Sequence, residues 1–114
     1  MDTSTLTQEI AELHAKLCSA LADPTRLLLL YMLSEQPSNV SELTQKLNSP
    51  QPSVSRHLRV LRDGGLVRAT RQGMNVLYEL TDQRIIEALD LLRAVLRDRI
   101  HYSANLIDEL NPSQ

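Results

Sequence analysis

The segment from Ser53 to Val67 reads SVSRHLRVLRDGGLV, and its apolar residues have the spacing of one helix face. Val54, Leu58 and Leu61 recur at i, i+4 and i+7, which places them on a single stripe that a core would cover. The sequence Asp63-Gly64-Gly65 then ends the helix, because glycine readily adopts the left-handed conformation found after helix C-termini. The segment therefore predicts an amphipathic helix that stops at the two glycines.

The opposite face of this helix is polar and basic, with no acidic side chain before Asp63. Its polar residues are Gln51, Ser53, Ser55, Arg56 and Arg59. Arginine can bind the O6 and N7 atoms of guanine with two hydrogen bonds, glutamine can do the same for adenine, and serine reaches base edges or phosphates. A helix that faced only solvent would more often pair Lys with Glu at i, i+4. We therefore expect this helix to read base edges in the major groove of DNA.

A two-stranded hairpin is predicted directly after the helix. The first strand begins at Leu66-Val67, the loop is Gln72-Gly73-Met74-Asn75, and the second strand contains Val76, Tyr78 and Leu80. Arg68 and Arg71 project from this hairpin. A cationic loop of this kind binds phosphates or a minor groove, so we expect it to add affinity beside the helix.

Upstream of the hairpin the apolar pattern predicts three more helices, over residues 6–21, 24–34 and 41–47. Asp23 is suited to accept from a free backbone amide as N-cap, and Pro24 suits the first helical position. The block Leu27–Leu30 is apolar nearly all round, which predicts a central, buried helix. Asn48-Ser49-Pro50 has the length of the turn that joins the two helices of a helix–turn–helix.

A last helix over residues 83–107 completes the pattern. The predicted fold is mainly α with a small β-hairpin, a winged helix–turn–helix in the order of four helices, two strands and one helix. The chain has 114 residues, which predicts a single domain over residues 1–114.

The charge distribution favours a DNA partner more than the total charge does. The formal net charge is −2, but residues 51–73 hold five arginines against one aspartate, a net charge of +4, so the remaining residues carry −6. A local basic stripe still attracts phosphates, because fields are screened within about 8 Å at physiological salt. Only Tyr31, Tyr78 and Tyr102 are aromatic, which disfavours single-strand binding by stacked rings.

The N-terminus MDTSTLTQEI lacks the basic and apolar regions of a secretory signal. The longest apolar run, Leu27–Leu33, is far shorter than the roughly 20 residues that cross a bilayer. With Cys18 as the single cysteine, the chain has no internal disulfide framework. These features predict a cytoplasmic protein with no membrane partner.

The last predicted helix carries more apolar residues than one face of a monomer can cover. They are Ile85, Ile86, Leu89, Leu92, Val95, Leu96, Ile100, Leu106 and Ile107. The first helix has a comparable stripe of Leu6, Ile10, Leu13, Leu17 and Leu21. We therefore expect dimerisation helices at residues 6–21 and 83–107, which would place two reading helices about one DNA turn, roughly 34 Å, apart. The alternative is an extra core helix in a monomer.

Three motifs carry a resemblance that covers nearly the whole chain. They are ALADPTRLLLLYML (Ala20–Leu33), SVSRHLRVLRDGGLV (Ser53–Val67) and RQGMNVLYEL (Arg71–Leu80). In these motifs the chain resembles the arsenic-repressor (ArsR/SmtB-type) family of bacterial winged-helix regulators. The resemblance implies a homodimeric repressor that binds a palindromic operator and dissociates when an inducer, often a metal or metalloid, binds.

By motif match, the resemblance places DNA contacts on two parts of the chain. They fall on Gln51, Ser53, Ser55, Arg56 and His57 in the helix and on Arg71 and Gln72 in the wing. The chain departs from the family at Pro50 and Pro52, both expected in the first turn of the reading helix, where the family usually has small polar residues.

The chain also departs from the family at the positions where its metal sensors carry their ligands. Family metal sensors often carry a pair of cysteines on the third helix, but the matching stretch Asn39–Glu42 has no thiol. Other members place ligands along the last helix; here Asp82 is kept, but Arg84 and Val95 stand where histidines would be expected.

Cys18 with His14 at i, i+4, and His101 from a partner subunit, are the remaining candidates for a thiophilic metal ion. Cys18 is alternatively a small buried core residue, or a site of thiol modification through a Cys18–Cys18 bridge, a persulfide or a mixed disulfide.

Two other classes of function are alternatives to a DNA-binding regulator: a protein-binding winged-helix module and an enzyme. A winged-helix module that binds protein instead of DNA would have acidic or apolar residues where Arg56, Arg59, Arg68 and Arg71 stand. An enzyme would show a phosphate-binding glycine loop, paired carboxylates or a nucleophile beside a base, and the sequence shows none of these signatures.

Overall fold

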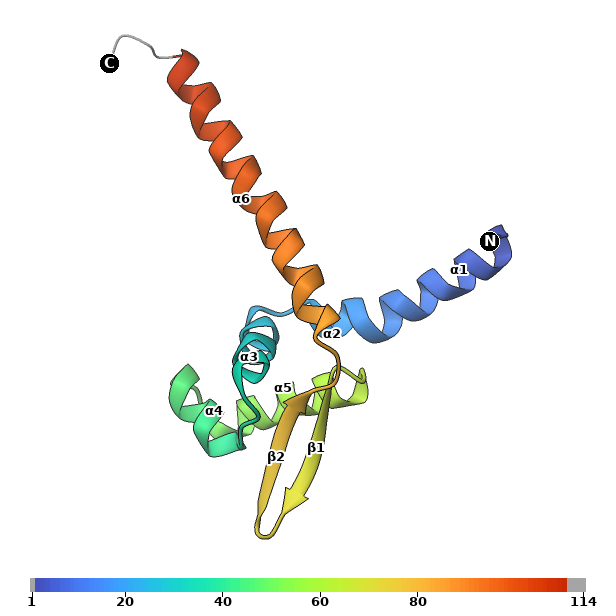
Figure 1. Cartoon of the computed structure of the whole chain (residues 1–114), viewed down its shortest axis with the longest axis vertical. Coiled ribbons are helices and arrows are strands. Elements are labelled where there is room, and N and C mark those ends of the chain that lie inside the picture. Colours follow the sequence, from blue (N-terminus) through green and yellow to red (C-terminus); the bar gives the residue numbers. More distant parts are fainter. Residues whose placement is uncertain (1, 111–114) are drawn as a thin grey trace. The chain divides into compact units, whose positions relative to one another are not determined.

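The computed structural model describes residues 2–110, with side chains over residues 2–106, and the chain forms two compact units, Met1–Gln83 and Arg84–Gln114. The first unit contains α1 (Thr3–Glu12), the π-helical segment η1 (Leu13–Cys18), α2 (Ser19–Leu21), α3 (Pro24–Glu35), α4 (Val40–Leu47), α5 (Gln51–Asp63), β1 (Val67–Gln72) and β2 (Asn75–Leu80) (Figure 1). The second is the helix α6 (Arg84–Leu110). The predicted class, mainly α with one hairpin, is confirmed, and the single domain over residues 1–114 stays a prediction.

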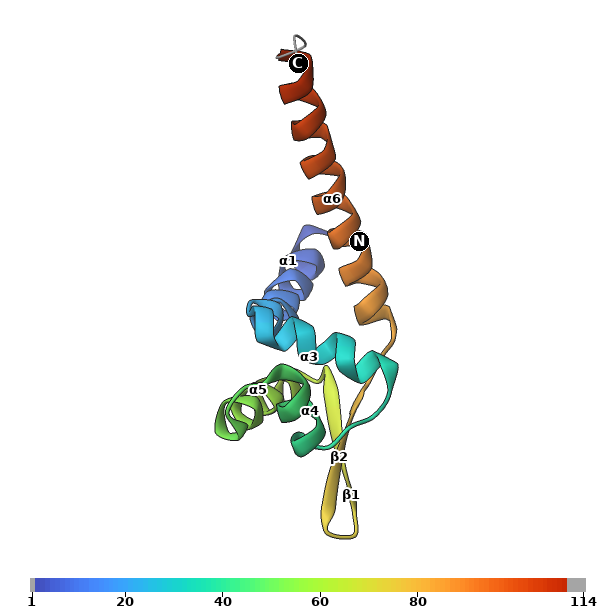
Figure 2. The same ribbon diagram turned by 90° about the vertical axis from the view of Figure 1, so that its left-hand side faces the viewer.

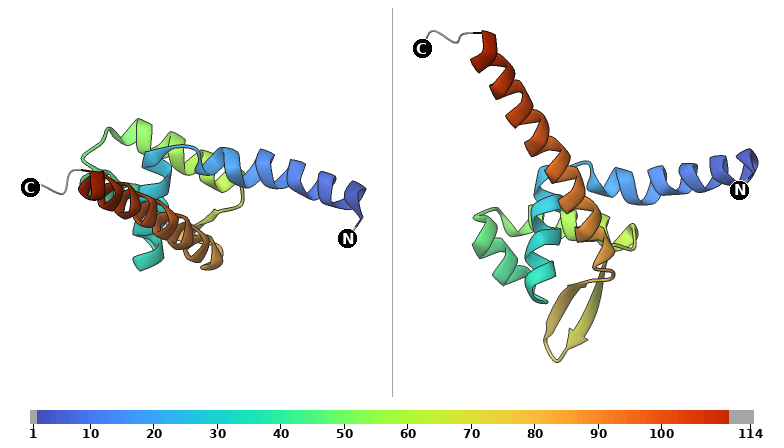
Figure 3. Two further views of the ribbon diagram at one scale, coloured as in Figure 1. Left: turned by 90° about the horizontal axis from the view of Figure 1, so that it is seen from above. Right: turned by 45° about the horizontal axis from the view of Figure 1, so that its top comes forward.

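The first predicted helix is longer and less regular than the sequence indicated. It begins at Thr3, not at Leu6, because the Asp2 carboxylate accepts a hydrogen bond from the Thr5 amide at 2.9 Å and caps it. It then passes through η1, where the Ser19 amide donates to the carbonyl of His14, five residues back. The three elements α1, η1 and α2 follow one another without a break (Figure 3). We call Thr3–Leu21 the N-terminal helical segment.

The core of the first unit forms around α3. Leu29, Leu30 and Leu33 of this helix are buried, as the apolar block predicted, although Leu28 is 52% exposed. The expectation that the block is buried all round is therefore wrong at Leu28. The other elements supply further buried apolar residues, namely Leu43, Val54, Leu58, Leu61, Leu66 and Val67.

Local hydrogen bonds define the helix–turn–helix. The Asn39 side chain accepts from the Glu42 amide at 2.9 Å, and the Glu42 carboxylate accepts from the Asn39 amide at 3.0 Å, so α4 starts on a capping box. Asn48 ends α4 in the left-handed conformation (φ 51°). Pro50 precedes α5 as its N-cap, and only Pro52 lies in the first turn, which corrects the prediction that both prolines do.

The hairpin of β1 and β2, which we call the wing, is antiparallel and turns on two residues. Gln72 pairs with Asn75, so the loop is Gly73-Met74, shorter than the predicted four residues. Gly73 has φ +62°, the conformation that a primed hairpin turn demands at its first central position. In Figures 1 and 2 the wing extends beyond α4 and α5.

Ser38 forms an isolated antiparallel β-bridge with Tyr78 of the hairpin, which the sequence did not predict. Its amide donates to the Tyr78 carbonyl at 3.0 Å, and the Tyr78 amide donates to the Ser38 carbonyl at 2.8 Å. Ser38 is fully buried, so this bridge fixes the link between α3 and α4 against β2. None of the helices described between residues 2 and 110 combines the length and the apolar character that a membrane crossing requires.

Candidate nucleic-acid interface

Helix α5 has one buried side and one exposed side. Val54, Leu58 and Leu61 are fully buried, as their spacing predicted. On the other side of the helix Gln51, Ser55, Arg56 and Arg59 are exposed beside Val60, and Ser53 is half-buried. We call the five polar residues the reading face.

The two arginines of the reading face are chemically available. Among the side chains described over residues 2–106, those of Arg56 and Arg59 have no hydrogen bond or ion pair. Each guanidinium group therefore keeps all five of its N–H donors for a ligand outside the chain. A planar donor fork of this kind suits a guanine edge or a phosphate.

The two arginines of the wing, Arg68 and Arg71, differ in whether a carboxylate pairs with them. Arg68 lies directly opposite Glu79, and its Nε donates to Glu79 Oε1 at 2.7 Å, so the two charges offset each other. Arg71 lies opposite the apolar Val76 and is exposed. Gln72 follows Arg71 and is also exposed. Of the two wing arginines, Arg71 is thus the one whose charge is uncompensated within the described chain.

The sequence contained a signal for the Arg68–Glu79 pair. Placing the hairpin turn on Gly73-Met74 sets Arg68 opposite Glu79 in the antiparallel register. The expected loop Gln72–Asn75 is centred on the same two residues and implies the same register, so the interpretation of Arg68 as a DNA contact overlooked a partner that the sequence already indicated.

His57 differs in orientation from the other residues expected to contact DNA. It is half-buried, and its Nδ1 lies 3.3 Å from Nη1 of Arg26 and 3.9 Å from Oδ1 of Asp23. The imidazole thus meets the N-terminal end of α3. The sequence pattern predicts Asp23 as a helix cap but does not indicate Arg26, because a contact over 31 residues leaves no periodic signal.

The Asp23 carboxylate caps α3, since its Oδ1 accepts from the amides of Thr25 at 2.8 Å and Arg26 at 3.2 Å. Desolvation of this carboxyl acts to raise its pKa. The amide hydrogen bonds from Arg26 and Thr25, with the charges of His57 and Arg26, outweigh that effect, so the pKa lies below its ordinary value of 3.8. Asp23 is therefore an anion at neutral pH, close to the imidazole and the guanidinium.

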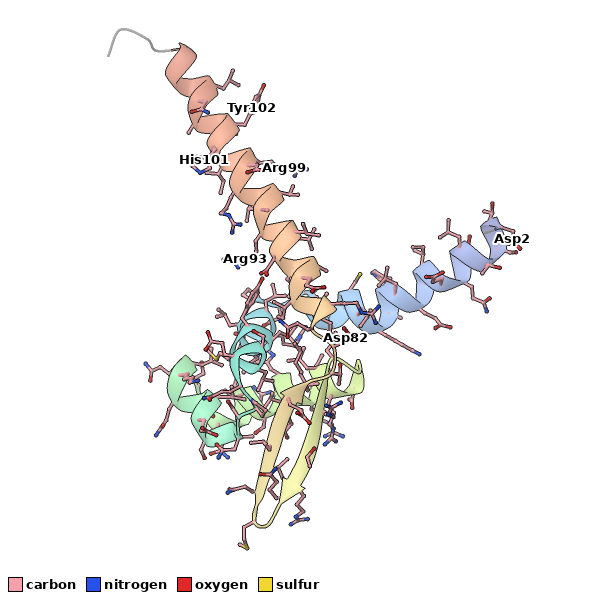
Figure 4. The ribbon with its side chains drawn as sticks, viewed as in Figure 1. Asp2, Asp82, Arg93, Arg99, His101 and Tyr102 are labelled. Carbon is pink, nitrogen blue, oxygen red and sulfur yellow. The ribbon has the colours of Figure 1, made fainter. Side chains whose placement is uncertain are left out.

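The residues proposed for a metal lie on two different helical parts of the chain. Cys18 is exposed, so the expectation of a buried core cysteine is wrong for this chain. His14 is exposed on the same segment, and His101 projects from α6 (Figure 4). Across the part of the chain that the structure describes, no three His, Cys, Asp or Glu side chains come together.

Comparison with known proteins agrees with this architecture. The family model described as bacterial regulatory protein, arsR family, matches residues 23–69, from the cap of α3 into β1. The chain is 37% identical over 82 residues to the HTH-type transcriptional regulator MJ1325 of Methanocaldococcus jannaschii, covering 71% of this chain and 92% of the relative. It is 40% identical over 78 residues to the HTH-type transcriptional repressor SmtB of Mycobacterium tuberculosis, covering 68% of this chain and 58% of that protein.

Solved structures show the same fold. The crystal structure of Mycobacterium tuberculosis Rv0081 matches with a TM-score of 0.74 at 30% identity, covering 83% of this chain and 96% of that one. The transcriptional repressor BigR from Xylella fastidiosa matches with a TM-score of 0.69 at 30% identity, covering 83% and 96%. The relatives are transcriptional regulators and repressors, so the chain is a regulatory protein and not an enzyme. Sequence and fold together show that it belongs to the arsR family of bacterial regulatory proteins.

Proposed function

We propose that two copies of this chain bind a palindromic operator and repress transcription from it. The observation that carries the proposal is the reading face of α5: its arginines are exposed and unpaired within the described residues, while the opposite side of the helix is fixed in the core. Such a helix can enter the major groove without giving up any internal contact of its own arginines. We expect the protein to act in the cytoplasm, where prokaryotic DNA lies.

Each part of the interface has a different task in this proposal. Arg56 and Arg59 bind base edges, while Gln51, Ser53 and Ser55 bind bases or the backbone near the N-terminus of α5. Arg71 and Gln72 bind phosphates or the minor groove from the wing. Arg68 contributes less, because Glu79 already pairs with it.

The apolar surfaces of α1 and α6 support a dimer. No residue of α1, over Thr3–Glu12, is buried, and its Leu6 and Ile10 are 45% and 51% exposed. In α6 the side chains of Leu92 and Leu96 are 64% and 59% exposed. Ile107, also expected at this interface, lies outside the described side chains. Exposed apolar rows of this kind are stabilised by burial against a second subunit.

The proposal is tested by selecting duplexes from a random-sequence pool with the purified chain. We expect the selected sequences to share an inverted repeat whose half-sites are about one helical turn apart. A matched chain in which Arg56 and Arg59 are both replaced by alanine should select no common sequence. Enrichment of an unrepeated site, or none at all with the unaltered chain, would contradict the proposal.

We further propose that an inducer releases the operator, and that Cys18 is the residue to examine first because its thiol is exposed. The candidate ligands for a thiophilic metal ion are Cys18 and His14 of one subunit with His101 of the partner subunit. Operator binding should be measured with zinc, copper, arsenite and a persulfide donor, for the unaltered chain and for Cys18→Ser. Release that is lost in Cys18→Ser supports a thiol-dependent inducer, and release that persists argues against one.

A further inference from the structure

We propose that Arg26 is a positioning residue for DNA reading: it does not touch DNA, but holds the recognition helix α5 through His57 and joins it to the end of the N-terminal helical segment. This inference rests on the proposed function, because its consequence is measured on operator binding. Neither the sequence pattern nor the reading face itself pointed to this residue.

The guanidinium group of Arg26 makes contacts in three directions. Its Nε donates to the carbonyl of Ala20 at 2.6 Å, and its Nη2 donates to the carbonyl of Ser19 at 3.2 Å. Its Nη1 lies 3.3 Å from Nδ1 of His57. A planar fork with five donors can satisfy all three acceptors at once, which a lysine ammonium on a flexible stem does less well.

The two carbonyls have a reason to accept from a cation. They lie in the last turn of α2, which ends at Leu21, where carbonyls lack the i+4 amide partner of a helix interior. The Ser19 carbonyl already accepts a 3.4 Å hydrogen bond from the Ala22 amide, and Arg26 donates to it in addition. The two carbonyls also carry the negative end of the helix dipole, which a cation stabilises. Arg26 thus caps the C-terminal end of the N-terminal helical segment from outside.

Asp23 fixes the backbone of Arg26 at the start of α3. Its carboxylate accepts from the Arg26 amide at 3.2 Å and lies 3.9 Å from the same Nδ1 of His57. The backbone of Arg26 is therefore fixed by the cap of α3, while its side chain spans from α2 to α5. Nδ1 accepts from Arg26 only in the neutral imidazole with its proton on Nε2, and in that form His57 has no proton or charge to offer Asp23.

His57 is well placed to orient the reading face. It follows Arg56 directly and precedes Arg59 by two positions, so its direction fixes theirs through the helix backbone. Val54, Leu58 and Leu61 hold α5 by apolar burial, which has little directional preference. A hydrogen bond on the flank of the helix depends on angle as well as distance, so it restricts rotation of α5 about its axis. Bidentate hydrogen bonding of an arginine to a base edge requires that the rotation of α5 be restricted in this way.

The experiment measures the dissociation constants of four variants for the operator and for a random duplex by fluorescence anisotropy. The variants are Arg26→Ala, Arg26→Lys, His57→Ala and His57→Asn. We expect Arg26→Ala, Arg26→Lys and His57→Ala each to weaken operator binding about tenfold, the size of one lost hydrogen bond to a charged group, with little change on the random duplex. His57→Asn should recover most of the affinity, because its amide oxygen can accept near the position of Nδ1.

A double variant, Arg26→Ala with His57→Ala, separates positioning from direct contact. If Arg26 acts through His57, the double variant should lose no more operator affinity than either single variant. Additive losses would mean that the two residues act separately, and would overturn the proposal. So would operator binding by Arg26→Lys that equals that of the unaltered chain.

Two controls keep the outcomes distinct. Arg62→Ala removes one exposed charge from α5 outside this network and should affect both duplexes equally. Circular dichroism and thermal unfolding show which variants fold; His57→Ala leaves the carbonyl bonds of Arg26 intact and serves if Arg26→Ala does not fold. An equal loss on both duplexes by a folded Arg26→Ala would contradict positioning. Failure of the unaltered chain to prefer any duplex would instead contradict the proposed function.

Discussion

At the scale of single residues, Arg56 and Arg59 owe their availability to their neighbours on α5. The residues between and around them, Val54, Leu58 and Leu61, are fully buried, so the arginines lie on the opposite, exposed side of the helix. The sequence predicted this division of the helix because burial follows the 3.6-residue period. It did not predict the inward direction of His57, because the residues that hold it come from a distant part of the chain.

Replacing Arg56 by alanine should lower operator affinity by about 1 to 3 kcal/mol and relax the preference at one base pair of each half-site, as expected when a base-edge contact is lost. The measurement is anisotropy on the operator and on operators with single base-pair changes. Arg62→Ala serves as the control. A loss of the same size on every duplex would show that Arg56 binds phosphate and reads no base.

Asp23 makes stability depend on pH. Its pKa in the folded chain lies below the ordinary value of 3.8, so the folded state binds the proton less readily than the unfolded state does. The stabilisation is therefore fully present above about pH 4 and is lost as the pH falls through the lower folded value. Denaturant unfolding of Asp23→Asn should show a less stable protein at pH 7 and a difference from the unaltered chain that shrinks below pH 4. A difference independent of pH would contradict the assignment.

At the scale of elements, the sequence did not predict the two irregular features, the π-helical segment η1 and the isolated bridge at Ser38. The π-helical η1 leaves the apolar spacing of the first helix intact, so the pattern predicted one continuous helix. The bridge at Ser38 is a single residue long and has no period. The helices 24–34 and 41–47 were predicted closely, since each has a cap residue and an apolar stripe that agree.

Gly64 allows α5 to approach η1 closely. A Cβ at this position would lie 2.8 Å from the carbonyl oxygen of Lys16 and 3.3 Å from Cβ of Ala20. We expect Gly64→Ala to lower the free energy of unfolding by about 1 to 3 kcal/mol, because backbone must move to relieve the overlap. Thermal and denaturant unfolding measure this. Gly65→Asn is the matched control: no neighbour lies within 4 Å there, and asparagine tolerates its φ of +78°. Equal stability of Gly64→Ala and the unaltered chain would contradict the close approach.

The wing should contribute affinity without reading sequence. Arg71→Ala is expected to weaken operator and random duplexes alike and to reduce the slope of log affinity against log salt by about one unit. Arg68→Ala should reduce that slope less, because Glu79 already pairs with Arg68 at 2.7 Å. Titrations over a range of salt concentrations compare the two. A larger effect at Arg68 than at Arg71 would show that the pair opens when DNA binds.

At the scale of the whole molecule, this member of the arsR family combines a winged helix–turn–helix in its first unit with end helices that expose apolar rows. The sequence predicted the class of fold and the apolar surplus from composition and period alone. It does not identify an inducer, because the stretches where family metal sensors carry paired cysteines or histidines lack those residues here.

The most direct test of the account is sedimentation of the purified chain with a duplex that carries the selected inverted repeat. We predict that two chains bind each duplex, and that inserting about five base pairs, half a helical turn, between the half-sites abolishes tight binding because the second α5 then faces the wrong side of the helix. One chain per duplex, with an affinity that the insertion leaves unchanged, would contradict the account.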